Sequence, residues 1–418
     1  MKNVLKVLVT ILIAIVVGAI SILILYSLPT SLMYENAKES ANLYGTEDRI
    51  NNWADGKHYA KVDNYADAIM IMTAIYRPHD SVIKNAFLNP YCKFDDTEMG
   101  NNLYKYLKGE TPDGFFNYDR YWHGYLLYLI PLLCFFNIGE IKIIWMFIQF
   151  LAIMFCLSEL GKRNSMYMML YAAVVLFLMP VTTAMSFHGG NVFILMLLFT
   201  AIILKFNGKL IIESGKYMIL FAIDGILVSF TDLLTYPLIA FGVPLVTVFL
   251  INDFDTKTGL KALFGNSFAW CAGYLGMWIG KWILAFAFTG ENVIEESAKQ
   301  IAFRTQGDAT LESAEGNTYI YALKSVWWVI RNPIFFALAL YVVAVLAICY
   351  VQGKRIFSQK VQAGVLLPTI LIAIVPFVWY FVVKNHSIIH PYLSYQELAI
   401  SIWAIFVYLL RSIKQGEK

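Results

Sequence analysis

Residues 7–28 form an apolar run, VLVTILIAIVVGAISILILYSL, that contains no charged side chain. A helix of about 20 such residues spans the roughly 30 Å hydrocarbon core of a bilayer. The run follows Lys2 and Lys6, as the hydrophobic region of a signal peptide would, but it is longer than such a region and no A-x-A-type cleavage site follows. We therefore expect an uncleaved anchor with its N-terminus in the cytoplasm.

Similar runs recur along the whole chain of 418 residues. Hydrophobic residues make up 59% of the sequence and charged residues only 15%, whereas soluble domains carry roughly 25% charged residues. This composition predicts an all-α polytopic membrane protein, and the small net charge of +3 gives no argument for a nucleic-acid partner. Further spans are expected at about 140–159, 165–181, 191–204, 217–231, 236–251, 266–288, 333–351, 361–383 and 396–410.

The segment from Trp122 to Phe136 decides the topology. It has only about 15 residues and contains a proline, and segments of that length are more often interfacial or re-entrant than spanning. If it does not cross, the basic clusters at 162–163, 205–216, 257–261, 354–360 and 411–418 all face the cytoplasm, as the positive-inside rule requires. We therefore expect about ten transmembrane helices, one non-crossing interfacial helix and both termini inside.

This topology makes residues 1–418 a single integral-membrane domain with two long extracytoplasmic insertions. The first covers residues 30–137, is too long for a simple connection, and has helical patterning from Tyr65 to Tyr76. The second covers residues 290–331. All six histidines fall on the outer side, so polar chemistry is expected there.

Two motifs in the first 160 residues carry a resemblance to a known family. The acidic stretch from Val62 to Asp67 (VDNYAD) stands in the first outer loop, where helical patterning follows. The stretch from Tyr121 to Arg163 opens with Y-W, continues into an apolar span and ends in a basic pair. This arrangement resembles the membrane glycosyltransferases of the GT-C superfold, in motif over the first 160 residues and in topology over the rest.

The resemblance implies an inverting, extracytoplasmic glycosyltransferase that moves a sugar from a polyprenyl-phosphate carrier to a cell-surface glycan or a lipid-linked acceptor. By the same resemblance, Asp63 takes the position of the general base, and Asp67 that of a supporting carboxylate or metal ligand. A carboxylate within hydrogen-bond reach of a hydroxyl can take its proton. Asn64 stands where many relatives carry a second acid, and this departure argues against a paired-carboxylate or metal-dependent version, although a divalent metal is left open as a cofactor. A helix N-cap is the alternative role of Asp63.

A phosphate leaving group needs cations or hydrogen-bond donors. Lys281 lies inside an apolar run, where a lysine is by default a functional candidate and snorkelling is the alternative. Lys384 offers a compact cation for the lipid phosphate. His386 and His390 stand four residues apart, a spacing that can ligate zinc, but Pro391 and the missing H-E-x-x-H order favour hydrogen bonding to a phosphate or sugar instead.

Other outer-face residues complete the predicted pocket. His188 lies in SFHGGN, which is either a tight turn or a binding segment. Asp232 lies in a very short turn between spans, where it needs a partner or an aqueous cavity, or caps the next helix. Arg304 either meets an anionic donor or is solvated. Trp122 and His123 open the interfacial segment, where rings stack on sugars or form the interfacial belt. The substrate-binding candidates are Lys281, Lys384, His386, His390, His188, Asp232, Trp122 and His123; no metal ligands are assigned.

Three other functions stay open at this point. A polysaccharide polymerase or ligase also has many spans and a large outer loop, although here the larger insertion comes early and carries acids. A lipid-linked saccharide transporter or flippase predicts more charged groups near the midplane than Asp224 and Lys281. A non-catalytic scaffold is the third. For each of them we expect a multi-pass protein of the bacterial cytoplasmic membrane, with its polar site on the extracytoplasmic side.

Overall fold

The computed structural model describes residues 2–44, 50–54, 56–95, 97–207, 215–306, 318–352 and 359–413. This part is almost entirely helical, with two small antiparallel sheets of two strands each. Parts of the basic clusters at 205–216, 354–360 and 411–418, and residues 307–317 of the second insertion, lie outside the described residues.

Seven helical segments of the described chain are long and apolar enough to cross a membrane. Three shorter helices occupy the remaining predicted spans. One of them, α8, ends earlier than predicted, because Met179 adopts φ +51° and Pro180 starts a new helix, α9 (Pro180–Met185). The long segments are α1 (Lys2–Ser27), α7 (Ile138–Gly161), α10 (Phe187–Phe206), α13 (Thr256–Thr289), α16 (Pro333–Val351), α17 (Ala363–Val382) and Pro391–Ser412. The shorter ones are α8 (Ser165–Phe177), α11 (Lys216–Thr231) and α12 (Leu238–Ile251).

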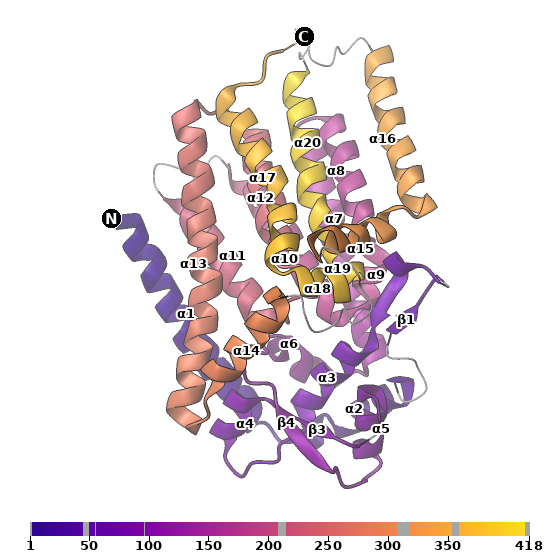
Figure 1. The fold of residues 1–418 in the computed structure, drawn as a ribbon, viewed down its shortest axis with the longest axis vertical. Helices are drawn as coiled ribbons and strands as arrows, with labels where there is room; N and C mark the ends of the chain where they lie inside the picture. Colours follow the sequence, from indigo (N-terminus) through magenta and orange to yellow (C-terminus); the bar gives the residue numbers. More distant parts are fainter. Residues whose placement is uncertain are drawn as a thin grey trace.

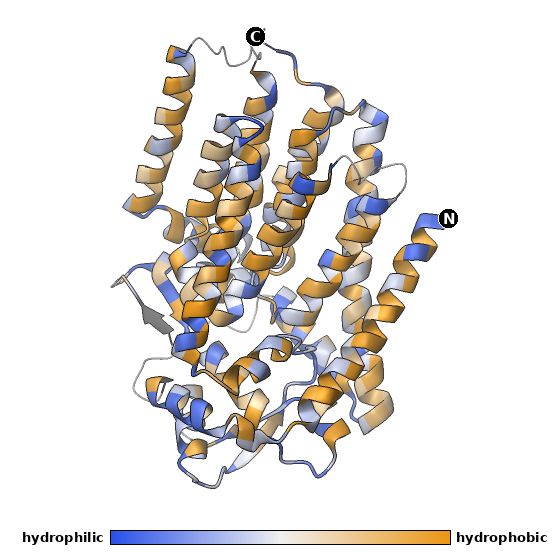
Figure 2. Cartoon of the chain, turned by 180° about the vertical axis from the view of Figure 1, so that it is seen from behind, coloured by the Kyte–Doolittle hydropathy of each residue, from blue (hydrophilic) through white to orange (hydrophobic). Residues whose placement is uncertain are grey.

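Large apolar side chains are exposed along the outside of the bundle. Leu12 of α1 is 64% exposed, Leu151 of α7 is 70% exposed and Leu340 of α16 is 70% exposed. Figure 2 shows hydrophobic residues along most of the length of these helices. Soluble monomers rarely expose apolar surface on this scale. The chain is therefore a multi-pass membrane protein.

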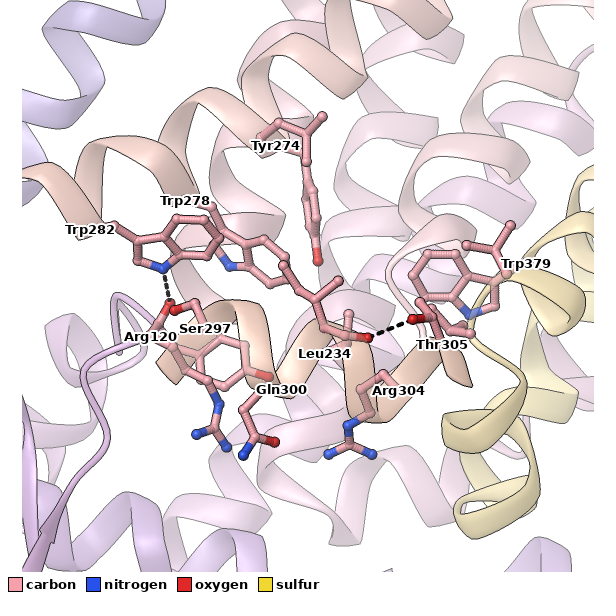
Figure 3. A pocket seen from close by; sticks show the side chains of 15 residues that line it. Arg120, Leu234, Tyr274, Trp278, Trp282, Ser297, Gln300, Arg304, Thr305 and Trp379 are labelled. Carbon is pink, nitrogen blue, oxygen red and sulfur yellow. Dashed lines mark hydrogen bonds between the residues drawn. The ribbon is translucent and has the colours of Figure 1, made fainter. Parts of the chain in front are cut away.

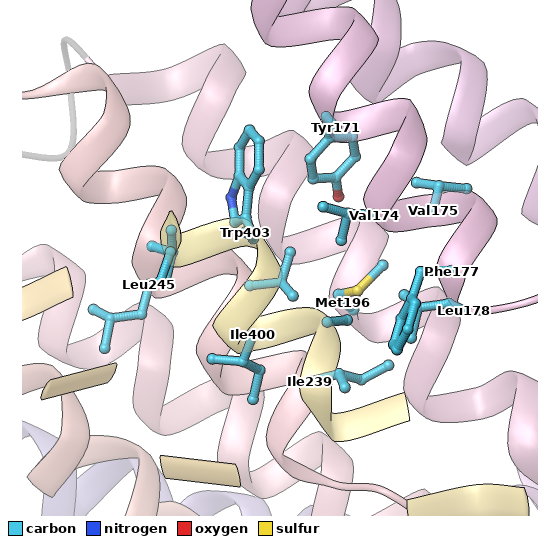
Figure 4. Close-up of a cluster of buried hydrophobic side chains, with 14 of the residues drawn as sticks. Tyr171, Val174, Val175, Phe177, Leu178, Met196, Ile239, Leu245, Ile400 and Trp403 are labelled. Carbon is cyan, nitrogen blue, oxygen red and sulfur yellow. The ribbon is translucent and has the colours of Figure 1, made fainter. Parts of the chain in front are cut away.

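Small residues bring the helices of the bundle close together. A side chain at Gly225 of α11 would meet the Trp270 carbonyl of α13 at 2.2 Å, and one at Gly273 of α13 would meet the Ala222 carbonyl of α11 at 2.3 Å. Close backbone approach of this kind is the usual way for helices to associate in a bilayer. Trp403 of α20 (Leu398–Ser412) packs against Tyr171 in the larger core cluster (Figure 4).

The first insertion folds at one end of the bundle, opposite the C-terminus (Figure 1), and we call this end the insertion end. The predicted helix from Tyr65 to Tyr76 is present as α3 (Asn64–Ile75). Within 122–136, α6 (Leu126–Leu133) has eight residues, about 12 Å, which is too short to cross. The other elements are η1 (Thr30–Leu32), α2 (Tyr34–Tyr44), β1 (Ile50–Asn52), η2 (His58–Ala60), β2 (Lys61–Asp63), α4 (Val82–Leu88), β3 (Pro90–Lys93), α5 (Met99–Leu107) and β4 (Gly114–Asn117).

Segments from the second half of the chain meet the first insertion. α13 has 34 residues, about 51 Å, and so extends beyond a 30 Å core before it ends at Gly290 with φ +77°. It leads into α14 (Val293–Gln306), which lies beside α18 (Lys384–Ile389). The remaining elements are α15 (Thr318–Ile330), α19 (Pro391–Ser394) and η5 (Tyr395–Glu397).

Candidate functional site

A polar cavity of about 220 Å³ lies where the first insertion meets α10, α14, α18 and α19. It brings together residues that are more than 300 positions apart in the sequence. Four predicted site residues line it, together with Arg304 and two residues that sequence analysis did not single out for a site, Arg120 and Thr235. The four are Asp63, His188, His386 and His390. We call it the polar cavity.

Asp63 joins the cavity to the start of α3. Its Oδ1 accepts a hydrogen bond from the Ala66 N–H at 3.2 Å, so the carboxylate caps the helix. Its Oδ2 accepts from the Tyr392 hydroxyl at 3.0 Å. The Asp63 carboxylate therefore has both roles: Oδ1 caps α3, and Oδ2 faces the cavity.

Two histidines and an arginine form another wall of the cavity. His386 Nε2 lies 3.1 Å from the Thr235 carbonyl oxygen, and its Nδ1 lies 3.2 Å from an Arg304 nitrogen. Because a carbonyl only accepts and a guanidinium only donates, Nε2 carries the proton and Nδ1 accepts. Burial, followed by the Arg304 charge, lowers the pKa of His386 to about 3, so the ring is neutral at physiological pH. The His390 ring is 5.1 Å from that of His386.

Asp67 is buried behind the cavity and does not line it. Its carboxylate lies 2.8 Å from Lys142 Nζ of α7 and accepts the backbone N–H groups of Phe187 and His188 at 3.2 and 3.1 Å. Burial alone would raise the pKa of Asp67, but the Lys142 ammonium and the His188 hydrogen bond lower it well below its usual range. The ionised carboxylate therefore ties α3 to α7 and α10.

His188 links this buried network to the polar cavity. Its Nδ1 lies 3.3 Å from Asp67 Oδ1 and 3.0 Å from Ser186 Oγ, while the residue lines the cavity. The neighbouring Gly190 is required by close packing, because a side chain there would come within 2.8 Å of Gln149, Thr183 and Trp145. Through its contact with Nδ1, Asp67 positions the His188 imidazole. Lys142 is the partner that sequence analysis missed; a lysine just inside the apolar run at 140–159 was the available signal.

Asp232 shapes the turn that carries Thr235 to the cavity. Its carboxylate accepts the Thr235 N–H at 3.0 Å and the Thr235 hydroxyl at 2.6 Å. Burial raises the pKa of Asp232 to about 6, although these hydrogen bonds act in the opposite direction. In this structure the carboxylate holds the turn beside the cavity rather than in its wall, and it does not cap α12, whose N-cap position is Pro237.

The two predicted lysines lie outside the wall of the polar cavity. Lys281 of α13 is fully buried, and its Nζ donates to the Phe87 carbonyl at 2.8 Å and to Asn89 Oδ1 at 2.7 Å. It therefore anchors the loop after α4 to α13. Lys384 of α18 places its Nζ 4.6 Å from the centre of the Tyr319 ring, a cation–π contact with α15.

Trp122 and His123 are both buried in the packing of the segment before α6. Trp122 Nε1 donates to the Met277 carbonyl at 2.6 Å. His123 adopts φ +56°, and its ring nitrogens lie 2.7 Å from the Tyr125 hydroxyl and 2.7 Å from the Tyr118 carbonyl. Both rings therefore hold this segment against its neighbours.

An aromatic groove of about 280 Å³ adjoins the polar cavity (Figure 3). Tyr274, Trp278 and Trp282 recur every four residues on α13 and form one side, and α14 and the end of α17 form the other. Arg120, Leu234 and Arg304 line both the groove and the polar cavity. The two spaces therefore meet at a pair of guanidinium groups.

Arg120 is held at this junction by aromatic rings. Its guanidinium lies 4.6 Å from the centre of the Tyr118 ring and 5.3 Å from that of Tyr121. Trp282 Nε1 donates to the Arg120 carbonyl at 3.1 Å, which fixes the backbone to α13 (Figure 3). Arg120 was not among the residues predicted from the sequence, although it directly precedes the Y-W motif and the aromatic residues of α13 recur every four positions.

Within the described ranges, no group of three or more His, Cys, Asp or Glu side chains is arranged to hold a metal ion. His386 and His390 form a pair without a third such ligand there. The chain matches no protein-family model, no curated protein and no solved structure.

Proposed function

We propose that the chain is an extracytoplasmic, inverting glycosyltransferase that uses a polyprenyl-phosphate-linked sugar. The observation that carries the proposal is the junction of the aromatic groove with the polar cavity at Arg120 and Arg304. A polyprenyl-phosphate sugar has the same order of parts: an apolar tail, an anionic phosphate and a polar sugar. The groove takes the end of the tail, the two arginines take the phosphate, and the polar cavity takes the sugar.

The location of the groove supports a lipid donor. Tyr274 and Trp278 belong to α13 and Trp379 to α17, and both helices are candidate membrane spans. A prenyl chain can therefore enter from the bilayer without crossing water. Arginine also suits phosphate better than lysine does, because its planar fork donates two parallel hydrogen bonds.

Asp63 then acts as the general base. Its Oδ2 takes the proton of the acceptor hydroxyl while the acceptor oxygen forms a bond to the anomeric carbon of the sugar. The bond from that carbon to the phosphate oxygen breaks, and its electron pair leaves with the phosphate, which Arg120 and Arg304 stabilise. Tyr392 positions the carboxylate through its 3.0 Å hydrogen bond.

The proposal also includes the number of membrane crossings and the orientation of the chain in the membrane. We infer ten crossings, made by the seven long segments together with α8, α11 and α12, with both termini in the cytoplasm and the insertion end outside. The five free cysteines are first replaced, and single cysteines are introduced at Lys162 and Lys205. A membrane-impermeant thiol reagent added outside intact cells should leave both positions unlabelled; labelling would reverse the orientation.

The test of the function is sugar transfer by membranes that carry wild type, Asp63→Asn or Asp80→Asn, supplied with a panel of polyprenyl-phosphate sugars and cell-envelope acceptors. Asparagine is as good an N-cap as aspartate, so Asp63→Asn keeps the cap and removes the base. We expect a loss of about 10²–10⁴-fold, the usual contribution of general-base catalysis. Asp80 is an exposed aspartate of the same insertion and serves as the matched control.

Two other outcomes of the transfer assay would contradict parts of the proposal. Transfer retained by Asp63→Asn would exclude this residue as the base. Absence of transfer by the wild type from every donor would contradict a glycosyltransferase of this kind, and would favour a polymerase or ligase, or a lipid-linked saccharide transporter.

A further inference from the structure

A second apolar groove, of about 390 Å³, lies on another side of the molecule, and we call it the α16 groove. The end of α8, the start of α9 and the first half of α16 form its walls, through residues such as Leu176, Val181, Ala337 and Leu338. Its volume falls in the range of about 300–1,000 Å³ that is typical of small-molecule sites. In Figure 1, α16 and α9 lie on the opposite side of the bundle from α13 and α14, which form the aromatic groove.

The β1–β2 hairpin connects the α16 groove to Asp63. Trp53 lines the groove and follows β1 directly, and its Nε1 donates to Thr182 Oγ1 at 2.9 Å. Ile50 of β1 pairs with Asp63 of β2. Trp53 is three residues from Ile50, so at 3.2–3.4 Å per strand residue its Cα lies about 10 Å along the hairpin from the residue that pairs with Asp63.

Positive charge lies at the same end of the groove. Lys61 follows η2 on the hairpin, with its Nζ 5.6 Å from the centre of the Tyr392 ring, whose hydroxyl donates to Asp63. Arg331 lies two residues before Pro333, the first residue of α16, whose side chains line the groove. His58 has a buried Nδ1 without a hydrogen-bond partner among the described residues. Tyr59, which follows His58 in η2, has its ring 5.9 Å from that of Phe335 in α16, so the hairpin packs on the start of this helix. Burial, followed by the charges of Lys61 and Arg331, lowers the pKa of His58.

We propose that the α16 groove holds the prenyl chain of the sugar acceptor, so that the acceptor is itself a lipid-phosphate-linked saccharide. The proposal rests on the proposed function and narrows its acceptor class. Arg331 and Lys61 meet the phosphate of the acceptor, as Arg120 and Arg304 meet that of the donor. Asp63 lies between the two, where the acceptor hydroxyl has to be deprotonated.

The occupant is a lipid rather than a protein segment because α16 is a candidate membrane span and most of its large apolar side chains face outward. A groove on such a helix opens to the bilayer. The cationic end distinguishes a phosphate-bearing lipid from a neutral one. The reaction then leaves the new saccharide on a lipid carrier, so a later reaction of the transferase class must move the finished glycan to its final acceptor.

Photo-crosslinking tests the groove without relying on activity. The full-length protein in phospholipid nanodiscs is irradiated with a polyprenyl phosphate that carries a diazirine in its chain, and labelled peptides are identified by mass spectrometry. We expect labels at 176–181 and 334–341 as well as on α13, α14 and α17. Labels confined to α13, α14 and α17 would overturn the inference. Equal labelling at the α16 groove by a diazirine phosphatidylcholine would do so too.

Two alanines of α16 supply a matched pair of variants. Ala337 lines the groove, whereas Ala339 is exposed on the same helix outside it. Ala337→Trp fills the groove, so labelling there should be lost, while Ala339→Trp should keep it. In transfer assays we expect Ala337→Trp to raise KM for a lipid-linked acceptor by about tenfold or more, with KM for the donor unchanged. Equal behaviour of the two variants would contradict the proposal.

The two readouts separate this inference from the proposed function. Labelling of the α16 groove without transfer by the wild type would retain the lipid site and reject the glycosyltransferase. Transfer by the wild type to free, water-soluble saccharides as efficiently as to lipid-linked ones, with no effect of Ala337→Trp, would retain the glycosyltransferase and reject the lipid-linked acceptor.

Discussion

Asp63, the N-cap of α3, and Asp67, in the first turn of α3, stand one helical turn apart, and their surroundings differ completely. Asp63 is half-buried, caps the helix with one oxygen and presents the other to the polar cavity and Tyr392. Asp67 is fully buried and surrounded by Lys142, His188 and two backbone N–H groups. A base needs access to a substrate proton, whereas a structural anion needs complete hydrogen bonding. The difference teaches that accessibility, rather than spacing along α3, separates a catalytic from a supporting carboxylate.

The basic residues differ in the same way as the two aspartates, in that some are buried inside the protein and others line the cavity. Lys281 and Lys142 are engaged with protein groups in the interior. Arg120 and Arg304 line both the polar cavity and the aromatic groove, so their guanidinium groups are placed to meet a ligand. Both arginines also contact protein groups, Arg304 the His386 ring at 3.2 Å and Arg120 the Glu296 carboxylate at 4.0 Å, so their position in the cavity wall is what distinguishes them from the two lysines.

The largest expected effect is on the stability of the Asp67 region. Asp67→Asn leaves the Lys142 ammonium without its anion, and breaking a buried ion pair in this way costs about 3–5 kcal/mol. We expect strongly reduced thermal stability of the detergent-solubilised protein, measured by near-UV circular dichroism. Lys142→Met should have a similar effect, and the double variant Asp67→Asn/Lys142→Met should recover part of the loss, because the amide oxygen of asparagine can still accept a hydrogen bond from the backbone N–H groups of Phe187 and His188. Wild-type stability of Asp67→Asn would show that the pair is not structural.

The next effect is on donor binding at the junction of groove and cavity. Arg304→Gln removes a charged donor, and a hydrogen bond to a charged group is worth about 1.5–3 kcal/mol. KM for the polyprenyl-phosphate sugar should therefore rise by about ten- to a hundredfold. Lys299→Gln removes a charge of the same sign from the same helix, α14, where it forms only an exposed pair with Glu295, and should change KM little. Equal effects of both variants would indicate non-specific electrostatics instead.

Hydropathy was enough to predict much of the fold. The multi-pass, all-α architecture follows from long apolar runs, and the helix at Tyr65–Tyr76 follows from its spacing, because both signals are local. The spans predicted at 217–231 and 236–251 match α11 and α12 within two residues, whereas the span predicted at 165–181 ends at Phe177, because the positive φ of Met179 is set by tertiary packing. Helix periodicity alone could not indicate that α6 would end after eight residues.

The candidate site was less accessible to sequence reasoning. Asp63, His188, His386 and His390 were singled out as polar residues of the outer face, and they do line one cavity. Asp67 was grouped with Asp63 because its partners, Lys142 and His188, lie 75 and 121 residues away along the chain. Arg120 was missed because a basic residue next to aromatics also fits an ordinary interfacial position. Pairings over such separations depend on the fold and leave no local pattern.

Acidification should change the contributions of His386 and Asp232 to stability in opposite directions. The folded-state pKa of His386 is about 3, below its ordinary 6.5, so its contribution to stability is present above pH 6.5 and is lost as the pH falls toward 3. The folded-state pKa of Asp232 is about 6, above its ordinary 3.8, so its contribution is present at low pH and is lost as the pH rises through 6. Between pH 6.5 and 5, His386→Gln should flatten the fall in melting temperature and Asp232→Asn should steepen it. Identical slopes in the two variants would contradict these assignments.

The smallest expected effect isolates the cap function of Asp63. Asp63→Ala removes both the base and the N-cap of α3, whereas Asp63→Asn removes only the base. The alanine variant should therefore be less stable than the asparagine variant by about 1 kcal/mol, the typical cost of losing such a cap, while both lose sugar transfer to the same extent. Thermal unfolding and transfer assays on the same preparations measure the two properties together. If the alanine variant retained more activity than the asparagine variant, the carboxylate would not be the base, because the two substitutions remove it equally.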